Sequence, residues 1–302
     1  MRYLTLRHLT DAFYRTYPDL RTTPLHPLAA SYDIAVGQFP RHLNALGFLA
    51  GFTCPGSTPA CRACCYTQGG RAGLQPALQA RARNTHTLLQ LCQREDVEAL
   101  AGEVGRLMDH AYGQYRRRLQ GGGEIRFRAG ALFRHHWSGD LVDATHAQAT
   151  YQATARRPEL QCWLYTRSFH LLPLLDPPPP NLTVWISQDD DNYHEAEQGA
   201  RHYPWARRAV LKRRDEVREA DRVCTKLREG RRVATAGACA RCRICVQPSA
   251  QENRLIFPIK PYAHVHPIPD LPAPRPERSM PVPEARRGRR PRGLEPFQKR
   301  GP

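Results

Sequence analysis

The sequence predicts an α/β protein, built either as a partial (β/α) barrel or as an open parallel sheet. Short apolar stretches alternate with helix-like stretches from residue 124 onward, and a long amphipathic segment precedes them. Strands that alternate with helices are typical of parallel βαβ units joined by right-handed crossovers. With 302 residues, of which 41% are hydrophobic, the chain can bury one substantial core.

The individual elements follow from the spacing of apolar residues. Between residues 77 and 119, apolar side chains from Val97 to Tyr115 recur at steps of three and four, and three glycines follow at 121–123, which predicts one long helix. The later segment 207–222, "RRAVLKRRDEVREADR", is interpreted as an exposed charged helix, with nucleic-acid contact as a second interpretation. The remaining expected elements are strands over 44–52, 124–134, 160–166 and 181–187 and helical stretches over 142–157 and 168–175.

Changes in composition divide the chain into four parts. We expect an N-terminal extension (1–30), an α/β core with a first cysteine cluster (31–215), a segment with a second cysteine cluster (216–268) and a tail (269–302). The tail is rich in proline and arginine and is predicted to be disordered. No run approaches the roughly 18 apolar residues of a membrane helix, and no signal peptide is recognised, so a cytoplasmic protein without a membrane segment is expected.

The chain has a formal net charge of +17, of which the last 33 residues supply nine basic against four acidic side chains. A surplus of this size favours contact with phosphate groups. Nucleic acid or a nucleotide is therefore the expected partner, and the alternative is a basic surface that binds nothing.

Three polar segments follow predicted strands, at residues 135–140 ("HHWSGD"), 166–168 ("TRS") and 187–192 ("SQDDDN"). Functional groups of parallel sheets gather where the strands end, so these segments should meet at one edge. The resulting candidate cofactor-binding residues are His136, Ser138, Gly139, Asp140, Arg167, Ser187 and Asp189.

Each of these segments also has a structural interpretation. Ser138 or Asp140 could cap a helix that starts near Asp143. Arg167 could face an anion or pair with a carboxylate at the edge of the core. The aspartates at 189–191 could bind a hard cation, or form a solvated loop in which one member faces the site.

The first cysteine cluster, "TCPGSTPACRACC", predicts a metal site. Closely spaced thiols on a tight loop can converge without a large entropy of closure. The expected ligands are Cys54, Cys61 and Cys65, with Cys64 as the rival of Cys65. Three thiolates would leave one iron of a 4Fe-4S cluster free for another ligand.

The second cluster contains Cys239, Cys242 and Cys245 in a C-x2-C-x2-C run, with Cys224 as the candidate fourth ligand. This spacing is typical of loops that wrap a 4Fe-4S cluster, and zinc is the alternative metal. The two remaining cysteines outside the clusters, Cys92 and Cys162, are interpreted as small core residues.

Taken in order, the segments "TCPGSTPACRACCY", "RARN", "FRHHWSGDL", "WLYTRS", "VWISQDD" and C-x2-C-x2-C resemble the gene product 88 family of phages and bacterial genomes, over residues 31–245. The layout is also similar to that of radical S-adenosylmethionine enzymes, although the first loop reads C-x6-C-x3-C where those enzymes usually carry C-x3-C-x2-C. That resemblance implies a cluster on Cys54, Cys61 and Cys65. It also implies that residues 138–140 meet the amino group of S-adenosylmethionine, and that Ser187 and Asp189 meet its ribose.

Two function classes follow from these observations. The first is an iron–sulfur enzyme, with one or two 4Fe-4S clusters, that cleaves S-adenosylmethionine to a 5′-deoxyadenosyl radical and acts on an unknown, nucleotide-like or nucleic-acid substrate. The second is a zinc-stabilised, non-catalytic nucleic-acid-binding protein.

Overall fold

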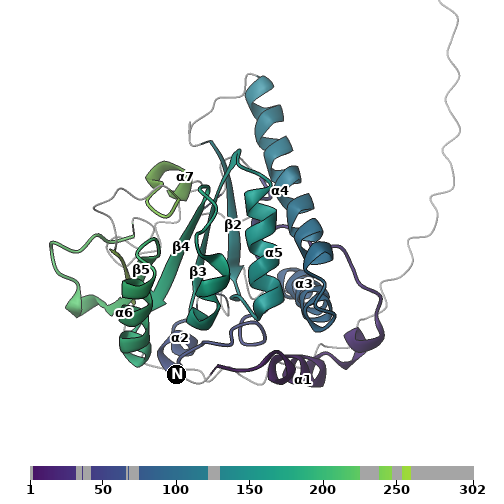
Figure 1. The fold of residues 1–302 in the computed structure, drawn as a ribbon, viewed down its shortest axis with the longest axis horizontal. Helices are drawn as coiled ribbons and strands as arrows, with labels where there is room; N and C mark the ends of the chain where they lie inside the picture. The colour runs from purple at the N-terminus through teal and green to yellow at the C-terminus, as the bar shows by residue number, and fades with distance from the viewer. Residues whose placement is uncertain are drawn as a thin grey trace, which may run out of the picture.

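The structure, a computed structural model, describes residues 3–31, 36, 42–65, 67, 75–121, 130–224, 238–246 and 254–259. It confirms the α/β class and has the form of an open sheet (Figure 1). Six parallel strands lie in the order β1-β2-β3-β4-β5-β6, so each strand pairs with the next one in the chain. The strands are β1 (Ala45–Gly47), β2 (Ala131–Ser138), β3 (Leu160–Thr166), β4 (Leu182–Gln188), β5 (Arg207–Arg213) and β6 (Arg254–Ile259). The predicted tail lies outside the described residues.

The helices alternate with the strands as predicted. They are α1 (Leu6–Thr16), α2 (Pro59–Ala63), α3 (Gln75–Gln93), α4 (Val97–Gln120), α5 (Ala144–Ala155), α6 (Tyr193–His202) and α7 (Ala238–Cys242). Short 3-10 helices cover Pro18–Thr22, Phe169–Leu175, Asp190–Asn192 and Arg214–Glu216. Within the described residues, no helix combines the length and the hydropathy needed to cross a membrane.

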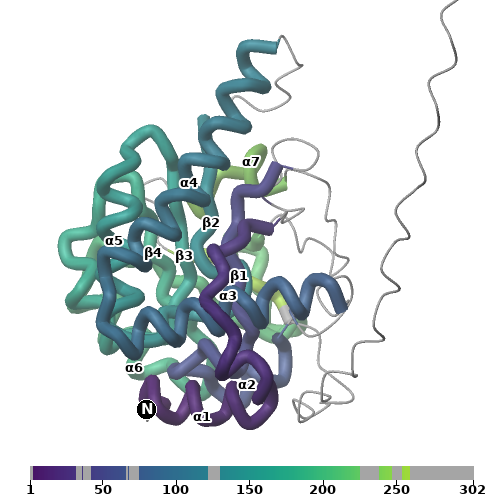
Figure 2. The backbone as a smooth tube through the Cα atoms, turned by 90° about the vertical axis from the view of Figure 1, so that its right-hand side faces the viewer, coloured from purple at the N-terminus to yellow at the C-terminus, as the bar shows by residue number. Residues whose placement is uncertain are grey.

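The two faces of the sheet are covered differently. The main core packs α1, α3, α4, α5 and α6 against one face, through residues such as Phe133, Leu164 and Ile186. On the opposite face, Trp163 and Trp185 pack with Ile244 and Cys245 of the second cysteine segment. Side chains alternate between the faces of a strand, so neighbouring positions of β3 and β4 serve different cores. In both views α2 lies at the lower end of the sheet and α7 toward the upper end (Figures 1 and 2).

The single long helix predicted over residues 77–119 is wrong, because the chain forms two helices there. A turn at residues 94–96 separates α3 from α4, and Glu95 adopts a φ of 53° within it. Asp96 then caps α4 by accepting a hydrogen bond from the Ala99 amide at 2.9 Å. A left-handed residue followed by an N-cap ends one helix and begins another, although the apolar spacing runs on across the break.

The charged helix predicted over residues 207–222 is also wrong. Residues 207–213 form β5, an interior strand that pairs with both β4 and β6. Its charged side chains have acidic partners on neighbouring segments, Arg208 with Glu197 and Lys212 with Asp221. The short "AVL" at residues 209–211 was the signal for a strand, and the charges around it concealed that signal.

Smaller shifts affect the strands nearest the site. The first strand is only three residues long, within the 44–52 predicted. The described part of the next strand runs from Ala131 to Ser138, whereas a strand over 124–134 was predicted; residues 124–129 lie outside the described residues. Consequently His135 and His136 belong to β2 and not to the loop after it.

Three buried histidines lie together behind β2. The His136 ring lies 4.7 Å from that of His146 and 6.0 Å from that of His135, measured between centroids. Because His136 has a φ of 49°, the alternation of β2 breaks and both of its histidines contact the helix-covered face. Burial lowers the pKa of His135 to about 3 and that of His146 to about 3, so these rings are neutral in the folded protein.

This cluster predicts a loss of stability in mild acid. Between pH 6.5 and about 3, His135 and His146 are protonated in the unfolded chain but stay neutral in the folded chain. The free energy of unfolding therefore falls as the pH falls. For each such histidine the loss between pH 7 and pH 5 is about 2 kcal/mol, taking about 6.5 for the unfolded pKa. We expect His146→Asn to flatten the pH dependence of urea unfolding by about this amount. The exposed His202→Asn serves as the control, and equal slopes for the two variants would contradict the prediction.

Candidate functional site

The carboxyl ends of three strands meet the first cysteine loop. At β2, the Phe48 amide donates to the Ser138 carbonyl at 2.9 Å and the Ser138 hydroxyl donates to the Phe48 carbonyl at 2.6 Å. The Asp140 amide then donates to the carbonyl of Thr53 at 2.8 Å. These bonds fix the residue before Cys54 directly onto the end of β2.

Two carboxylates and one arginine extend this contact to β3 and β4. The Asp140 carboxylate accepts a hydrogen bond from the Arg167 amide at 2.8 Å. The Arg167 guanidinium pairs with Asp189 at 3.0 Å, and both side chains are largely buried, with 13% and 3% of their area exposed. Two roles were predicted for Arg167, contact with an anion or pairing with a carboxylate at the edge of the core. The structure shows the second, with Asp189 as the partner.

The same aspartate holds the cysteine loop. Thr58 donates its hydroxyl to Asp189 at 2.7 Å and accepts the Cys61 amide at 2.9 Å, so it caps α2 at the same time. The Asp191 carboxylate accepts the Ala60 amide at 2.8 Å. Two of the three consecutive aspartates therefore anchor the start of α2, the buried Asp189 and the exposed Asp191.

Two glycines make this close approach possible. A Cβ on Gly56 would lie 2.3 Å from the Arg167 carbonyl oxygen. Gly139 has a φ of 89°, and a Cβ there would lie 2.6 Å from the hydroxyl of Thr53. Gly139 was predicted to bind a cofactor, and the close contact that requires a glycine here is made by Thr53 beside the cysteine loop.

The electrostatics of the loop reflect burial and the nearby charges. Burial raises the pKa of Cys54, and the charges of Asp140, Cys61 and Cys65 raise it further. Burial also raises the pKa of Cys61, whereas the neighbouring Arg167 acts to lower it.

Asp140 lies in the same low-dielectric surroundings. Burial raises its pKa to about 6, although hydrogen bonds from Arg167, Thr166 and Leu141 act against the rise. The Asp140 carboxylate therefore has a much higher proton affinity than an exposed carboxylate. It does not cap the following helix, because Asp143 does so by accepting the His146 amide at 2.9 Å.

The sequence did not predict Arg81 as part of this site. Its guanidinium is buried, donates to the Ser138 hydroxyl at 3.2 Å and lies over the Trp137 ring at 5.3 Å. It also reaches the Thr67 carbonyl at 3.5 Å, and the Thr67 hydroxyl lies 3.1 Å from the Cys65 sulfur. Arg81 therefore connects Cys65 to β2, and the segment "RARN" that contains it was the available signal.

Not all predicted site residues come together. Ser138, Gly139, Asp140, Arg167 and Asp189 lie at the loop, and Ser187 is the last residue but one of β4, two positions before Asp189. His136 lies among the buried histidines on the opposite, helix-covered face. Its predicted contact with a cofactor gains no support from this position.

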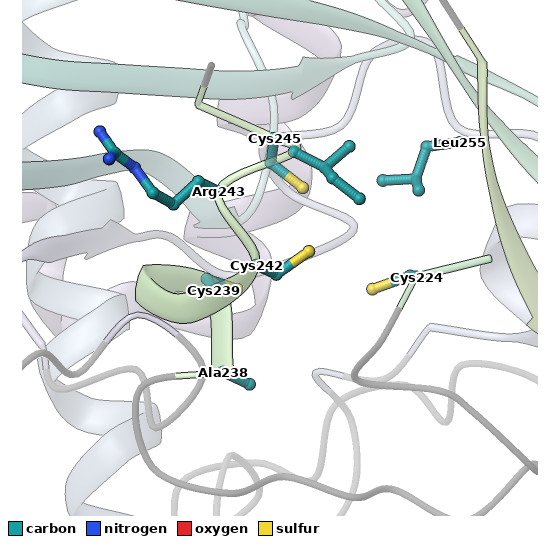
Figure 3. Close-up of a pocket in the computed structure, with 8 residues that line it drawn as sticks. Cys224, Ala238, Cys239, Cys242, Arg243, Cys245 and Leu255 are labelled. Carbon is teal, nitrogen blue, oxygen red and sulfur yellow. The ribbon is translucent and has the colours of Figure 1, made fainter. Parts of the chain in front are cut away.

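The second cluster forms a separate pocket. Cys224, Cys239, Cys242 and Cys245 line it together with Ala238, Arg243, Ile244 and Leu255. The sulfur atoms of Cys224, Cys242 and Cys245 point into the space between α7 and Leu255 (Figure 3). Cys92 and Cys162 are buried core residues, as predicted.

The chemistry of both donor sets suits a metal, because thiolates bind iron, iron–sulfur clusters and zinc. In the side-chain positions of the described residues, however, no three His, Cys, Asp or Glu groups are arranged to hold a metal ion. Binding at either cluster would require the thiols to rotate, and the ligand assignments of both clusters stay predictions.

Fold and site together define a parallel α/β protein with a cysteine loop at the carboxyl edge of its sheet and a second cysteine pocket on one face. The chain belongs to the Gene product 88 family, whose profile matches residues 20–248, and this confirms the predicted resemblance. It is 27% identical over 210 residues to the Gene 88 protein of Mycobacterium phage L5. The aligned region covers 67% of this chain and 82% of that protein. No solved structure matches the chain.

The close packing at Gly56 predicts that Gly56→Ala weakens the cysteine loop. The new methyl group would meet backbone atoms, which cannot move aside cheaply, so we expect a loss of about 1–3 kcal/mol in the free energy of unfolding. Thiol labelling of Cys54 and Cys61 should become faster. The control is Gly102→Ala in α4, where a Cβ meets nothing within 4 Å and should be neutral or stabilise by up to about 1 kcal/mol. Unchanged labelling in Gly56→Ala would contradict the prediction.

Proposed function

We propose that the protein is an iron–sulfur enzyme of the radical S-adenosylmethionine type. The observation that carries this proposal is the convergence of the cysteine loop with the ends of β2, β3 and β4. Ser138, Asp140, Arg167 and Asp189 lie on the carboxyl edge, together with the loop of Cys54, Cys61 and Cys65. In parallel α/β proteins this edge is where cofactors and substrates bind.

In this proposal Cys54, Cys61 and Cys65 would hold a 4Fe-4S cluster through three irons. With S-adenosylmethionine on the fourth iron, the cluster would supply one electron for cleavage of the sulfonium, and hydrogen abstraction from a substrate would follow. Burial raises the pKa of Cys61 on balance, and the positive charge of Arg167 beside it acts in the opposite direction, as a thiolate ligand would need.

The other residues of the edge would bind and orient S-adenosylmethionine. The carboxylate of Asp140 is a candidate partner for its amino group, and Ser187 and Asp189 are candidates for the ribose. Arg167 already pairs with Asp189, and this pair keeps the arginine within reach of an incoming carboxylate.

The second pocket would hold an auxiliary cluster on Cys224, Cys239, Cys242 and Cys245. Four thiols lining one small pocket leave no obvious open position, which suits electron transfer or structural support more than substrate binding. The same four thiols would equally suit a structural zinc ion, as in the alternative of a non-catalytic protein that binds nucleic acid. The net charge of +17 supports an anionic substrate or partner in both cases.

The proposal predicts that the two sites can be separated by one substitution. Cys61→Ala should remove the cluster at the first loop and leave the second occupied. After anaerobic reconstitution, about half of the iron and sulfide should be lost. Electron paramagnetic resonance of the reduced wild-type protein should change on addition of S-adenosylmethionine, and that change should disappear in Cys61→Ala.

The matched control is Cys92→Ala, which removes a buried thiol outside both clusters and should leave iron and spectrum unchanged. Stoichiometric zinc in the natively purified protein, with no cluster after reconstitution, would favour the nucleic-acid-binding alternative. Loss of both metals or of neither in Cys61→Ala would show that the two sites are not independent.

A further inference from the structure

The first cysteine loop lies at the carboxyl edge of the sheet and the second pocket lies on the face opposite the main helices, and the end of β3 contacts both. Tyr165 lies near the end of β3 and contacts the second pocket, whereas Arg167 follows the strand and acts on Cys61 of the first loop. The contacts to the two sites therefore start from neighbouring positions of the chain.

Tyr165 makes a specific contact with the second pocket. Its hydroxyl donates a hydrogen bond to the sulfur of Cys245 over 2.8 Å. The ring is fixed by an edge contact with Phe257 at 5.7 Å and by Trp185 at 6.2 Å, measured between centroids. The Arg134 guanidinium lies 5.5 Å from the ring on the neighbouring strand. The hydroxyl is therefore aimed at the sulfur by a rigid aromatic group.

The backbone of Cys245 is held as firmly as the tyrosine. The Trp185 indole donates to the Cys245 carbonyl at 2.9 Å, and the Thr183 hydroxyl donates to the next carbonyl, that of Val246, at 2.9 Å. Both donors come from β4, on the same face as Tyr165. The sheet thus holds the two successive carbonyls of Cys245 and Val246, and Tyr165 offers a further donor to the Cys245 sulfur.

We propose that Tyr165 is a positioning residue of the second pocket, whose hydroxyl donates to the Cys245 thiolate and tunes the metal group that this thiolate binds. The inference rests on the proposed occupation of the second pocket by an iron–sulfur cluster or another thiolate-bound metal. A hydrogen bond withdraws electron density from a ligating sulfur, and such bonds are among the factors that set the reduction potential of a cluster. Donation from Tyr165 should therefore favour the reduced, more negative state.

The test uses Tyr165→Phe in the Cys61→Ala chain, so that only the second pocket contributes a signal. After reconstitution with iron and sulfide, the cluster is titrated with a chemical reductant and followed by electron paramagnetic resonance. Loss of the hydroxyl should lower the ratio of reduced to oxidised cluster about tenfold at a fixed solution potential. This corresponds to a fall of about 59 mV in the reduction potential of the one-electron couple. Tyr203→Phe, a partly buried tyrosine in the other core, should leave the ratio unchanged.

A second measurement applies if the pocket takes up cobalt(II) or zinc but no cluster. Competition with a chelator should then reveal about tenfold weaker binding in Tyr165→Phe, and Tyr165→His, which keeps an N–H donor, should recover part of the loss. The phenyl ring keeps the contacts with Trp185 and Phe257, and thermal unfolding checks that the variant is folded.

The outcomes separate the two proposals. If Tyr165→Phe leaves the reduction potential or the metal affinity of the pocket as it is in the chain that keeps Tyr165, the role of Tyr165 is overturned. The proposed function then still stands. A wild-type chain that takes up neither iron, cobalt nor zinc at this pocket overturns the role of Tyr165 and the proposed auxiliary metal group, whereas the proposed cluster at the first loop is tested separately by its response to S-adenosylmethionine. If Tyr165→Phe and Tyr203→Phe lower the potential equally, the effect is not specific to the bond with Cys245, and the inference is wrong.

Discussion

The buried ion pair between Arg167 and Asp189 connects the first cysteine loop to the sheet. Asp189 also accepts the hydroxyl of Thr58 at the start of α2, and the Arg167 amide binds Asp140, whose own amide holds the loop. The contacts therefore form a closed circuit through one loop and three strands. Removing one partner of such a pair usually costs about 3–5 kcal/mol, because the other charge stays buried without compensation. The position of the thiols depends on this circuit more than on the loop's own sequence.

The alternation of side chains along β3 and β4 divides the molecule into a core and a functional face. Leu164 and Ile186 pack against helices, whereas Tyr165, Arg167 and Trp185 face the cysteine segments. A shift of β3 by one residue would place Tyr165 in the helical core and Leu164 on the face of the second cysteine pocket. The same pairing that defines the sheet therefore also defines which residues reach each cysteine cluster.

Prediction from the sequence succeeded where local signals were strong. Polar residues flank β3, and a proline-rich connector precedes β4. The predicted boundaries of both strands agree with the structure to within one residue. The break between α3 and α4 was missed, because a single glutamate in the left-handed conformation leaves no trace in the apolar spacing. The strand β5 was missed because charged residues, which pair with acidic partners in the fold, surround its short apolar run. At the site, strand ends identified Asp140, Arg167 and Asp189.

Three further residues were not recognised from the sequence, because only the fold brings them to their partners. Arg81 lies 57 residues from Ser138, and Tyr165 lies 80 residues from Cys245. Thr58 is separated from Asp189 by 131 positions. Such contacts depend on the order of the strands, which spacing along one segment does not contain.

That separation of 131 residues between Thr58 and Asp189 also sets an order of events during synthesis. At about 5–20 residues per second, the ribosome needs roughly 7–26 s to extend the chain from the first cysteine loop to the residue that anchors it. Throughout that interval the four thiols at residues 54–65 are carried by a growing chain that lacks β4. The cysteine loop is therefore made early and secured late, so its thiols are open to oxidation or to metal before the sheet encloses them.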